Sequence, residues 1–179
     1  YSTFVSEGKA GKGLCGLARP THFQGVTTIC TKLFNLCMPD FVVLGQKDAQ
    51  QVVVLKKMIS DLNFPIEVIV GPIIRDPDGL AMSSRNEYLQ PRQREGALAL
   101  FKSMQAGKKL VEVKEVTNVE RVKSEMISIL MQSSVLRVNY VEIVDRRTMQ
   151  VEREIESGRS LIVVAAWLNK VRLIDNMPL

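Results

Sequence analysis

Residues 41–71 read FVVLGQKDAQQVVVLKKMISDLNFPIEVIVG, and this stretch decides the fold of the first half of the chain. The apolar run before Gly45 predicts a short strand that ends at that glycine. Asp48 is placed to cap the first turn of an amphipathic helix that continues to about Leu62. The β-branched run 66–70 predicts a second strand. Strand, helix and strand within about thirty residues form a βαβ unit, which implies a parallel sheet with ligands at the carboxyl ends of its strands.

Another amphipathic helix is predicted ahead of this unit, at residues 26–38. It stops before Pro39, because proline disfavours a helical conformation in the residue that precedes it. We expect its apolar positions to face inward, namely Val26, Ile29, Cys30, Leu33 and Cys37. The helix that follows Gly45 presents its own apolar face at Val52, Leu55 and Ile59.

The second half of the chain changes in character. The polar, turn-rich stretch 75–86 predicts a hinge or linker. Pro91 is expected to open a helix, and Thr117 with Glu120 matches a capping box that opens the next one. The residues expected to face inward on these two helices are Leu98, Phe101, Leu110, Val119, Val122, Met126 and Ile129.

Three strand candidates close the chain, at residues 138–144, 161–168 and 171–174. Asn169-Lys170 separates the last two and is a hairpin signal. Helices followed by hairpin-connected strands predict a small α+β domain with an antiparallel sheet.

Composition limits the classes of partner. The 179 residues are 46% hydrophobic and 24% charged, which is typical of a globular protein. A net charge of +5 suits a nucleic-acid ligand, but acidic residues alternate with the basic ones in 112–121 and 145–156, and aromatic residues make up only 6%. Little is therefore available for base stacking, and we expect no nucleic-acid partner.

We also expect no membrane partner. The longest apolar run, 161–168, is shorter than the roughly 18–20 residues that cross a bilayer, and residues 1–16 are too polar for a secretory signal. The cysteines Cys15, Cys30 and Cys37 are odd in number and match no metal-ligand spacing. We interpret them as reduced thiols of a soluble, cytoplasmic protein.

The segment GQKDAQQ (45–51) combines features that suit a nucleotide. Gly45 lets a ligand approach the backbone, Lys47 offers a mobile cation, and Asp48 begins a helix whose N-terminal amides favour anions. The alternative is an ordinary βα turn with a solvated lysine, which the spacing alone leaves equally open. Gln50 and Gln51 are adjacent amides that could bond a substrate or face water.

The segment DGLAMSSRN (78–86) is the second candidate. Consecutive serines supply hydroxyl groups and backbone amides, and Arg85 adds a planar charged group that matches phosphate geometry. The alternative is a helix-capping serine pair beside a surface arginine. His22, the only histidine, and Arg19 are weaker candidates, since both residue types are also common in purely structural settings.

Taken together, four segments resemble the pantothenate synthetases, which are the pantoate–β-alanine ligases of vitamin B5 biosynthesis. They are RPTHFQGV (19–26), GQKDAQQ, DGLAMSSRN with Tyr88-Leu89, and VAAWLNKVRLIDN (164–176). The resemblance covers essentially the whole chain. It implies a partial Rossmann-like parallel sheet of the nucleotidyltransferase type, with residues 1–73 as the C-terminal part of an ATP- and pantoate-binding domain and residues 74–179 as the small α+β domain.

The resemblance also implies a reaction. In this family the carboxylate of pantoate attacks the α-phosphorus of ATP to give pantoyl adenylate and pyrophosphate, and the amine of β-alanine then displaces AMP. The enzyme aligns the reactants and neutralises phosphate charge, with Mg²⁺ assisting and with no covalent nucleophile. The family forms homodimers, which is the assembly expected here.

Site residues carry over from the family position by position. The positions implied to bind ATP are Gly45, Gln46, Lys47, Asp48, Ile74, Met82, Ser83, Ser84 and Arg85, of which Lys47, Ser83, Ser84 and Arg85 are the implied catalytic residues. Asp48 would lie near the ribose or the metal, and Ile74 would meet the adenine through its backbone. Gln51, His22 and Arg19 are the implied substrate-binding residues.

Two departures from the family pattern stand out. Gln46 replaces the usual glutamate, and the PTMGxLHxGH segment, whose histidines contact the ATP phosphates, has no counterpart in this sequence. We therefore expect an N-terminally truncated enzyme whose isolated chain has little or no ligase activity. The open alternatives are a related adenylyl-transferring enzyme with another acid substrate, and a non-catalytic remnant that serves as a binding or dimerisation module.

Overall fold

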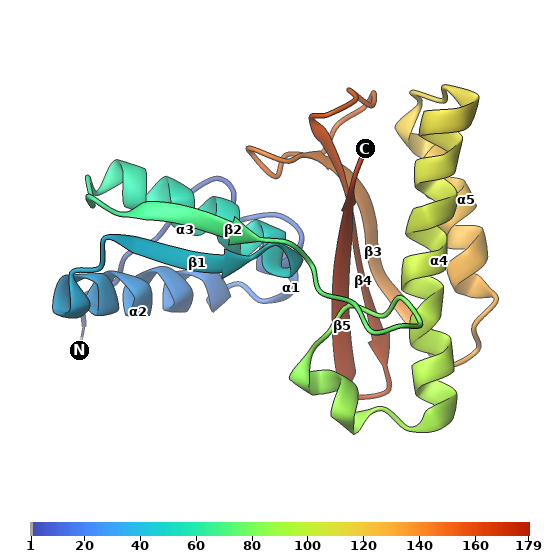
Figure 1. Ribbon diagram of the computed structural model, residues 1–179, viewed down its shortest axis with the longest axis horizontal. Coiled ribbons are helices and arrows are strands. Elements are labelled where there is room, and N and C mark those ends of the chain that lie inside the picture. Colours follow the sequence, from blue (N-terminus) through green and yellow to red (C-terminus); the bar gives the residue numbers. More distant parts are fainter. Residues whose placement is uncertain (1) are drawn as a thin grey trace. The chain divides into compact units, whose positions relative to one another are not determined.

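The computed structural model describes residues 2–179 and divides into two compact units (Figure 1). The first unit extends to Pro72 and includes Arg147–Gln150, and the second contains Ile73–Arg146 and Val151–Leu179. Along the chain the elements are α1 (Cys15–Ala18), α2 (His22–Cys37), β1 (Phe41–Gly45), the 3₁₀ helix η1 (Gln46–Asp48), α3 (Ala49–Asp61), β2 (Glu67–Gly71), the 3₁₀ helix η2 (Ser84–Tyr88), α4 (Pro91–Lys114), α5 (Val119–Met131), β3 (Leu136–Asp145), β4 (Ser160–Leu168) and β5 (Val171–Pro178).

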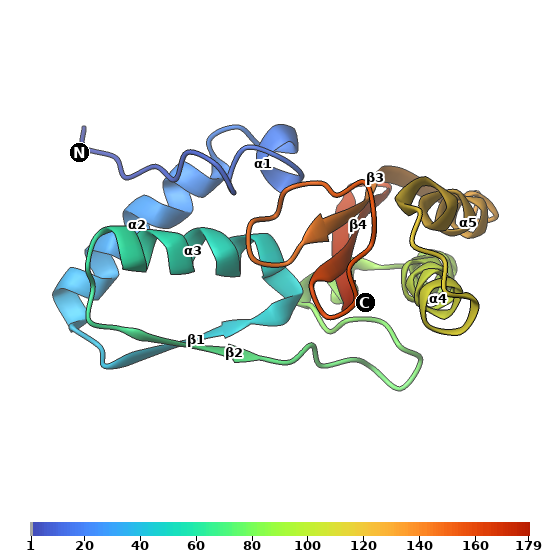
Figure 2. The ribbon, with the colours of Figure 1, turned by 90° about the horizontal axis from the view of Figure 1, so that it is seen from above.

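The first unit is built on a parallel pair of strands. β1 and β2 pair in register from Phe41 opposite Glu67 to Gly45 opposite Gly71, so that both glycines lie at the carboxyl edge. α3 connects the strands, and α2 lies beside it on the same face of the sheet (Figure 2). The predicted βαβ unit with a parallel sheet is confirmed.

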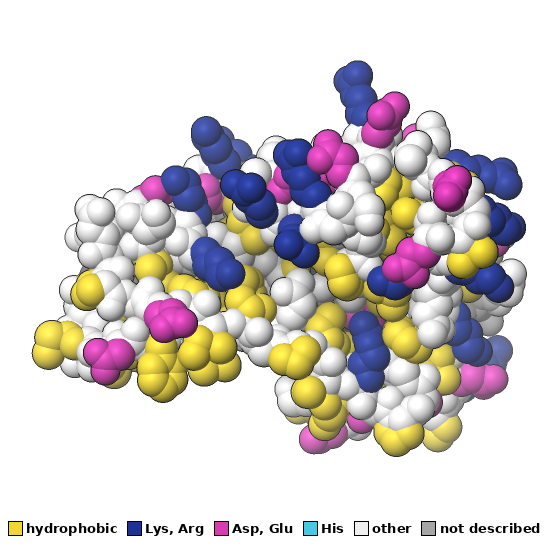
Figure 3. Space-filling view, turned by 45° about the horizontal axis from the view of Figure 1, so that its top comes forward, with side chains coloured by type: hydrophobic (Ala, Val, Ile, Leu, Met, Phe, Trp, Pro, Cys, Tyr) yellow, Lys and Arg dark blue, Asp and Glu magenta, His cyan; other side chains and the backbone are white. Residues whose placement is uncertain are grey.

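The core of this unit lies between the sheet and its two helices. α3 buries Val52, Leu55 and Ile59, as its periodicity predicts. The opposite face of the sheet leaves apolar side chains exposed at Phe41, Val43 and Ile69. Apolar side chains also show at the surface of this unit in the space-filling view (Figure 3). Parallel sheets are usually covered on both faces, and here the described residues cover one.

The prediction for the buried face of α2 was only partly right, because Val26 and Cys30 pack against the core whereas Cys37 is exposed. The helix begins at His22 and buries Phe23, Thr27, Thr28 and Phe34, while Ile29 and Leu33 are exposed. The N-terminal stretch accounts for part of the difference, because Thr27 Oγ1 donates to the Val5 carbonyl at 2.6 Å and the Val5 amide donates to Thr28 Oγ1 at 3.0 Å. Hydroxyl groups hold this stretch against the helix, and an apolar periodicity cannot detect them.

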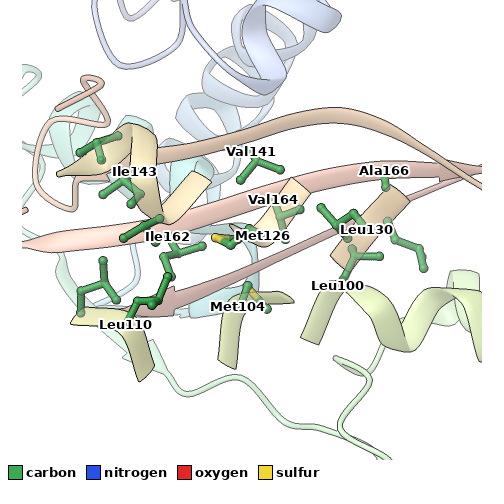
Figure 4. Close-up of a cluster of buried hydrophobic side chains, with 14 of the residues drawn as sticks. Leu100, Met104, Leu110, Met126, Leu130, Val141, Ile143, Ile162, Val164 and Ala166 are labelled. Carbon is green, nitrogen blue, oxygen red and sulfur yellow. The ribbon is translucent and has the colours of Figure 1, made fainter. Parts of the chain in front are cut away.

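The second unit is an antiparallel sheet covered by a helical pair. The strand order is β3-β4-β5, with β4 buried along almost its whole length. α4 and α5 pack against each other and against the sheet, and their side chains interdigitate with those of the strands in one core (Figure 4). The hairpin at Asn169-Lys170 is confirmed, with Asn169 at φ 54°. Acidic and basic side chains are interspersed on the face of this unit that Figure 3 shows.

Two local predictions in α5 were wrong. Asn118, and not Thr117, is the N-cap, and its side chain accepts a hydrogen bond from the Arg121 amide at 2.9 Å. Leu130 is fully buried in place of Ile129. With 3.6 residues per turn, the stripe that contains Met126 continues at the fourth residue after it, which is Leu130.

No helix among residues 2–179 combines the length and the apolar character that crossing a membrane requires.

Candidate functional site

The segment GQKDAQQ lies at the carboxyl edge of the parallel sheet. Gly45 ends β1, and a Cβ at this position would meet no described atom within 4 Å apart from its chain neighbours, so the backbone is open to approach at this point of the edge. Gln46 and Lys47 are half-buried on η1, and Asp48 is exposed. An open carboxyl edge that leads into a helix N-terminus is a suitable place for an anionic ligand.

The capping role predicted for Asp48 was only half right. Asp48 occupies the N-cap position of α3, but its side chain accepts no capping hydrogen bond. The reason is local, because η1 runs directly into α3 and leaves Asp48 at φ −94° and ψ 52°, away from the extended conformation of a typical N-cap. The Asp48 carboxylate therefore does not cap the helix. It is exposed at the surface, next to Lys47 along the chain.

The adjacent amides Gln50 and Gln51 have different environments. Gln50 is only 7% exposed, and its side chain bonds to the backbone of the loop that precedes α1. Gln51 is half-buried. Sequence reasoning left Gln50 open, although its position one helical turn before the fully buried Val54 was a signal that it faces inward.

Arg19 and His22 lie together. Nη1 of Arg19 is 3.3 Å from Nε2 of His22, and the His22 amide donates to the Arg19 carbonyl at 3.0 Å. Because a guanidinium only donates hydrogen bonds, His22 Nε2 acts as the acceptor in this arrangement. The His22 ring also packs on Phe23, with ring centroids 5.0 Å apart. Two residues implied to bind substrate are thus placed side by side.

The second unit holds the other predicted ATP-binding residues. The stretch between Ile74 and Met82 is an ordered hairpin, in which the Met82 amide donates to the Ile74 carbonyl at 2.9 Å and the Asp76 amide donates to the Leu80 carbonyl at 2.8 Å. The side chains of Ile74 and Met82 are both exposed. The structure therefore brings these two sequence-predicted residues together at the open end of one hairpin.

The serine pair begins the 3₁₀ helix η2. Ser83 caps this helix, because its Oγ accepts a hydrogen bond from the Arg85 amide at 3.3 Å. Nδ2 of Asn86 donates to the Ala81 carbonyl at 3.1 Å and ties η2 to the hairpin. Ser84 and Arg85 are exposed. Ser83 therefore caps the helix, as in the structural alternative for this segment, whereas Ser84 and Arg85 are exposed at the surface.

A partly buried ion pair, which sequence reasoning missed, holds the hairpin. Nη1 and Nη2 of Arg75 donate to the two carboxylate oxygens of Asp175 in β5, and the guanidinium lies over the Phe101 ring at 4.5 Å from its centroid. Arg75 Nη1 also donates to the Gly79 carbonyl at 3.0 Å. The only sign of this pair in the sequence was Asp175, an acidic residue that directly follows the apolar Leu173 and Ile174 in a predicted strand region. The pair fastens the hairpin to the sheet.

A second group of charges holds the other side of the hairpin. Arg94 of α4 donates to Asp76 Oδ2 and to Asp78 Oδ2, each at 2.8 Å. The Leu80 amide hydrogen bond, and then Arg94, lower the pKa of Asp78, while Asp76 and Asp78 raise the pKa of Arg94. The two carboxylates thus hold the hairpin to α4 through Arg94.

The profile of the family described as Pantoate-beta-alanine ligase matches residues 1–178, which include both segments just described. The chain belongs to this family. Pantothenate synthetases from Pseudothermotoga lettingae and Thermotoga neapolitana are 47% and 48% identical to it over 176 residues, which cover 98% of the chain and 62% of each relative. The chain thus spans less than two thirds of the length of the curated relatives it matches.

Solved structures of pantoate–β-alanine ligases have the same fold. A crystal structure of pantothenate synthetase from Thermus thermophilus matches 99% of the chain with a TM-score of 0.93 and 35% identity, and the match covers 63% of that protein. The Francisella tularensis ligase, complexed with beta-gamma ATP and beta-alanine, matches 98% of the chain with a TM-score of 0.73 and 26% identity over 58% of its own length. The predicted nucleotidyltransferase-type fold class is confirmed.

Proposed function

We propose that this chain provides the ATP- and pantoate-binding part of a ligase that condenses pantoate with β-alanine. A pantoate carboxylate oxygen attacks the α-phosphorus of ATP, and pyrophosphate leaves. The amine of β-alanine then attacks the acyl carbon of pantoyl adenylate, and AMP leaves. The observation that carries this proposal is the family match over residues 1–178, with GQKDAQQ at the open carboxyl edge of the parallel strands.

The proposed work of the residues is alignment and charge neutralisation. Lys47 contacts a phosphate from the edge of the first unit, and Gln51 holds pantoate together with Arg19 and His22. In the second unit Ser83, Ser84 and Arg85 surround the triphosphate. The exposure of Ser84 and Arg85 supports this role, because neither is buried in its own unit. Gly45, Gln46, Asp48, Ile74 and Met82 complete the proposed ATP contacts.

The proposal includes Mg²⁺, which would enter with ATP. Mg²⁺ prefers phosphate oxygens, water and one or two carboxylates, and Asp48 offers an exposed carboxylate at the proposed phosphate edge. Among residues 2–179, no group of three or more His, Cys, Asp or Glu side chains could hold a metal ion by itself. A cation shared with the nucleotide fits that composition. We further propose a cytoplasmic homodimer, as in the family.

Nucleotide binding is the direct test. We expect the 179-residue chain to bind MgATP in isothermal titration calorimetry, and we expect Lys47→Ala to weaken binding roughly ten- to a hundredfold, since a charge-assisted hydrogen bond contributes about 1.5–3 kcal/mol. Lys57→Ala is the matched control, because Lys57 is exposed further along the chain, on α3, and pairs with Asp61. Absence of MgATP binding by the wild-type chain, or equal losses in both variants, would refute the proposal.

Turnover is the second measurement. The sequence holds one histidine and therefore no HxGH motif, so we expect slow or undetectable AMP release from ATP, pantoate and β-alanine by this chain alone. Near-normal turnover would contradict that expectation. A preference for another carboxylate over pantoate in binding would favour a related adenylyl-transferring enzyme instead.

A further inference from the structure

The side-chain amide of Gln50 closes the loop that precedes α1. Its Oε1 accepts a hydrogen bond from the Cys15 amide at 3.0 Å, and its Nε2 donates to the carbonyls of Ala10 at 2.7 Å and Gly13 at 2.8 Å. A primary amide has two N–H hydrogens, and both are used here. The buried Gln50 is thus fully committed to three backbone groups that lie 35 to 40 residues earlier in the chain.

The loop that Gln50 closes is strained. Leu14 has φ 52° and ψ −116°, which is an unfavourable conformation for a residue with a branched side chain. Gly16 packs on the loop itself, since a Cβ at this position would lie 1.7 Å from the Gly11 carbonyl oxygen. Backbone strain of this kind persists only where surrounding contacts over-determine it. The three hydrogen bonds of Gln50 are contacts of that type.

The same loop leads directly to Arg19 and His22. Cys15, which donates to Gln50, is the first residue of the four-residue helix α1. The Arg19 amide ends this helix by donating to the Gly16 carbonyl at 3.3 Å, and the next contact is the one between Arg19 and His22. A movement at Cys15 would therefore shift Arg19 at the end of α1, and through it the contact with His22, the first residue of α2.

We propose that Gln50 is a positioning residue for the acid substrate. It holds the loop from Ala10 to Cys15 closed and thereby fixes Arg19 and His22, while its neighbour Gln51 contacts the same substrate. This inference rests on the proposed function, which assigns pantoate to those three residues. The two adjacent glutamines thus have different proposed roles. Gln50 binds the backbone of its own chain, and Gln51 binds the ligand.

Gln50→Glu tests the proposal with almost no change in shape. The carboxylate can still accept from the Cys15 amide, but it cannot donate to the carbonyls of Ala10 and Gly13. The readout of loop opening is the buried thiol of Cys15, alkylated with iodoacetamide and measured by peptide mass spectrometry. The exposed Cys37 is the internal reference, and burial raises the pKa of the Cys30 thiol, so that Cys30 should remain slow.

We expect Gln50→Glu to speed the alkylation of Cys15 by roughly tenfold or more relative to Cys37, as an opening free energy lowered by about 1.4 kcal/mol would do. Its affinity for pantoate should fall by a similar factor in ligand-observed NMR, while its affinity for MgATP should change less than about twofold. Gln51→Glu is the matched control, and it should weaken pantoate binding without changing the alkylation of Cys15. An unchanged Cys15 rate in Gln50→Glu would overturn the proposal.

Two further outcomes separate this inference from the function on which it rests. Equal weakening of pantoate and MgATP binding in Gln50→Glu would show general structural damage and would overturn the positioning role. Absence of pantoate binding by the wild-type chain would overturn the substrate assignment and the positioning role with it. If Gln50→Glu does not fold, the wild-type chain decides, because saturating pantoate should protect Cys15 from alkylation, and a lack of protection refutes the proposal.

Discussion

Arg75 and Asp175 form a two-pronged ion pair across 100 positions of sequence, with Nη1 to Oδ2 at 2.6 Å and Nη2 to Oδ1 at 3.0 Å. The Asp175 side chain is only 3% exposed, and its Oδ1 also accepts from the Asn176 amide at 2.8 Å. Phe101 supports the guanidinium from α4. The hairpin that carries two proposed nucleotide contacts is therefore fastened to the central sheet of its unit.

We expect Asp175→Asn to destabilise the second unit by about 3 kcal/mol, because removal of one partner leaves a charge without its counter-ion in a largely buried place. Urea denaturation followed by the fluorescence of Trp167, the only tryptophan, gives the free energy of unfolding. Glu112→Gln is the control, since it breaks the exposed pair with Lys108 and should cost less than about 0.5 kcal/mol. Equal effects would show that burial does not strengthen the Arg75 pair.

Gly79→Ala should be more damaging than Gly158→Ala. Both glycines have positive φ, 96° and 75°, so each variant carries a backbone cost of about 1–2 kcal/mol. A Cβ on Gly79 would also lie 2.3 Å from Cδ1 of Phe101, whereas one on Gly158 meets nothing within 4 Å. We expect the Gly79 variant to cost about 1–3 kcal/mol more in urea denaturation because of this overlap. Matching costs would mean that the Phe101 ring moves aside freely.

Asp78 should contribute a stability that acid removes. Its pKa is lowered in the folded protein by the Leu80 amide and by Arg94, so its contribution is present above the unfolded pKa of about 3.9 and disappears as the pH falls through the lower folded value. Asp78→Asn keeps an acceptor for the Leu80 amide and loses only the charge. The urea midpoints of the two proteins should therefore differ at about pH 6 and converge only once the pH has fallen below the folded pKa of Asp78. A difference that is independent of pH would contradict this mechanism.

Alanine substitutions of Ser83 and Ser84 should have different effects on hydrogen exchange at the Arg85 amide. Ser83→Ala removes the acceptor of the Arg85 amide, and we expect hydrogen exchange at that amide to accelerate roughly fivefold, as the loss of about 1 kcal/mol in a cap would produce. Ser84→Ala removes an exposed hydroxyl group and should leave the exchange rate unchanged. NMR of the ¹⁵N-labelled chain measures both. Acceleration in the Ser84 variant as well would show that the capping assignment is incomplete.

The sequence predicted some elements well for a physical reason. β1, β2 and α3 follow from residues 41–71, because the periodicity of apolar residues that marks a strand or a helix can be read from consecutive residues. The buried side of α2 was predicted only in part, and the cap of α5 was wrong, since each was decided by a choice between neighbouring side chains. Thr27 is buried in place of Ile29 through a contact with Val5, and Asn118 caps in place of Thr117 through the Arg121 amide.

The sequence by itself determined the family and the parallel and antiparallel halves, and it predicted the two segments GQKDAQQ and MSSRN as carriers of chemistry, because all of these are local patterns or ordered motifs. Only the tertiary structure decided that Gln50 serves the backbone and that Arg75 pairs with Asp175. Such contacts join residues tens of positions apart. Which residues meet in such contacts depends on how distant segments pack in the folded chain. The residue spacing within a single segment carries no information about it.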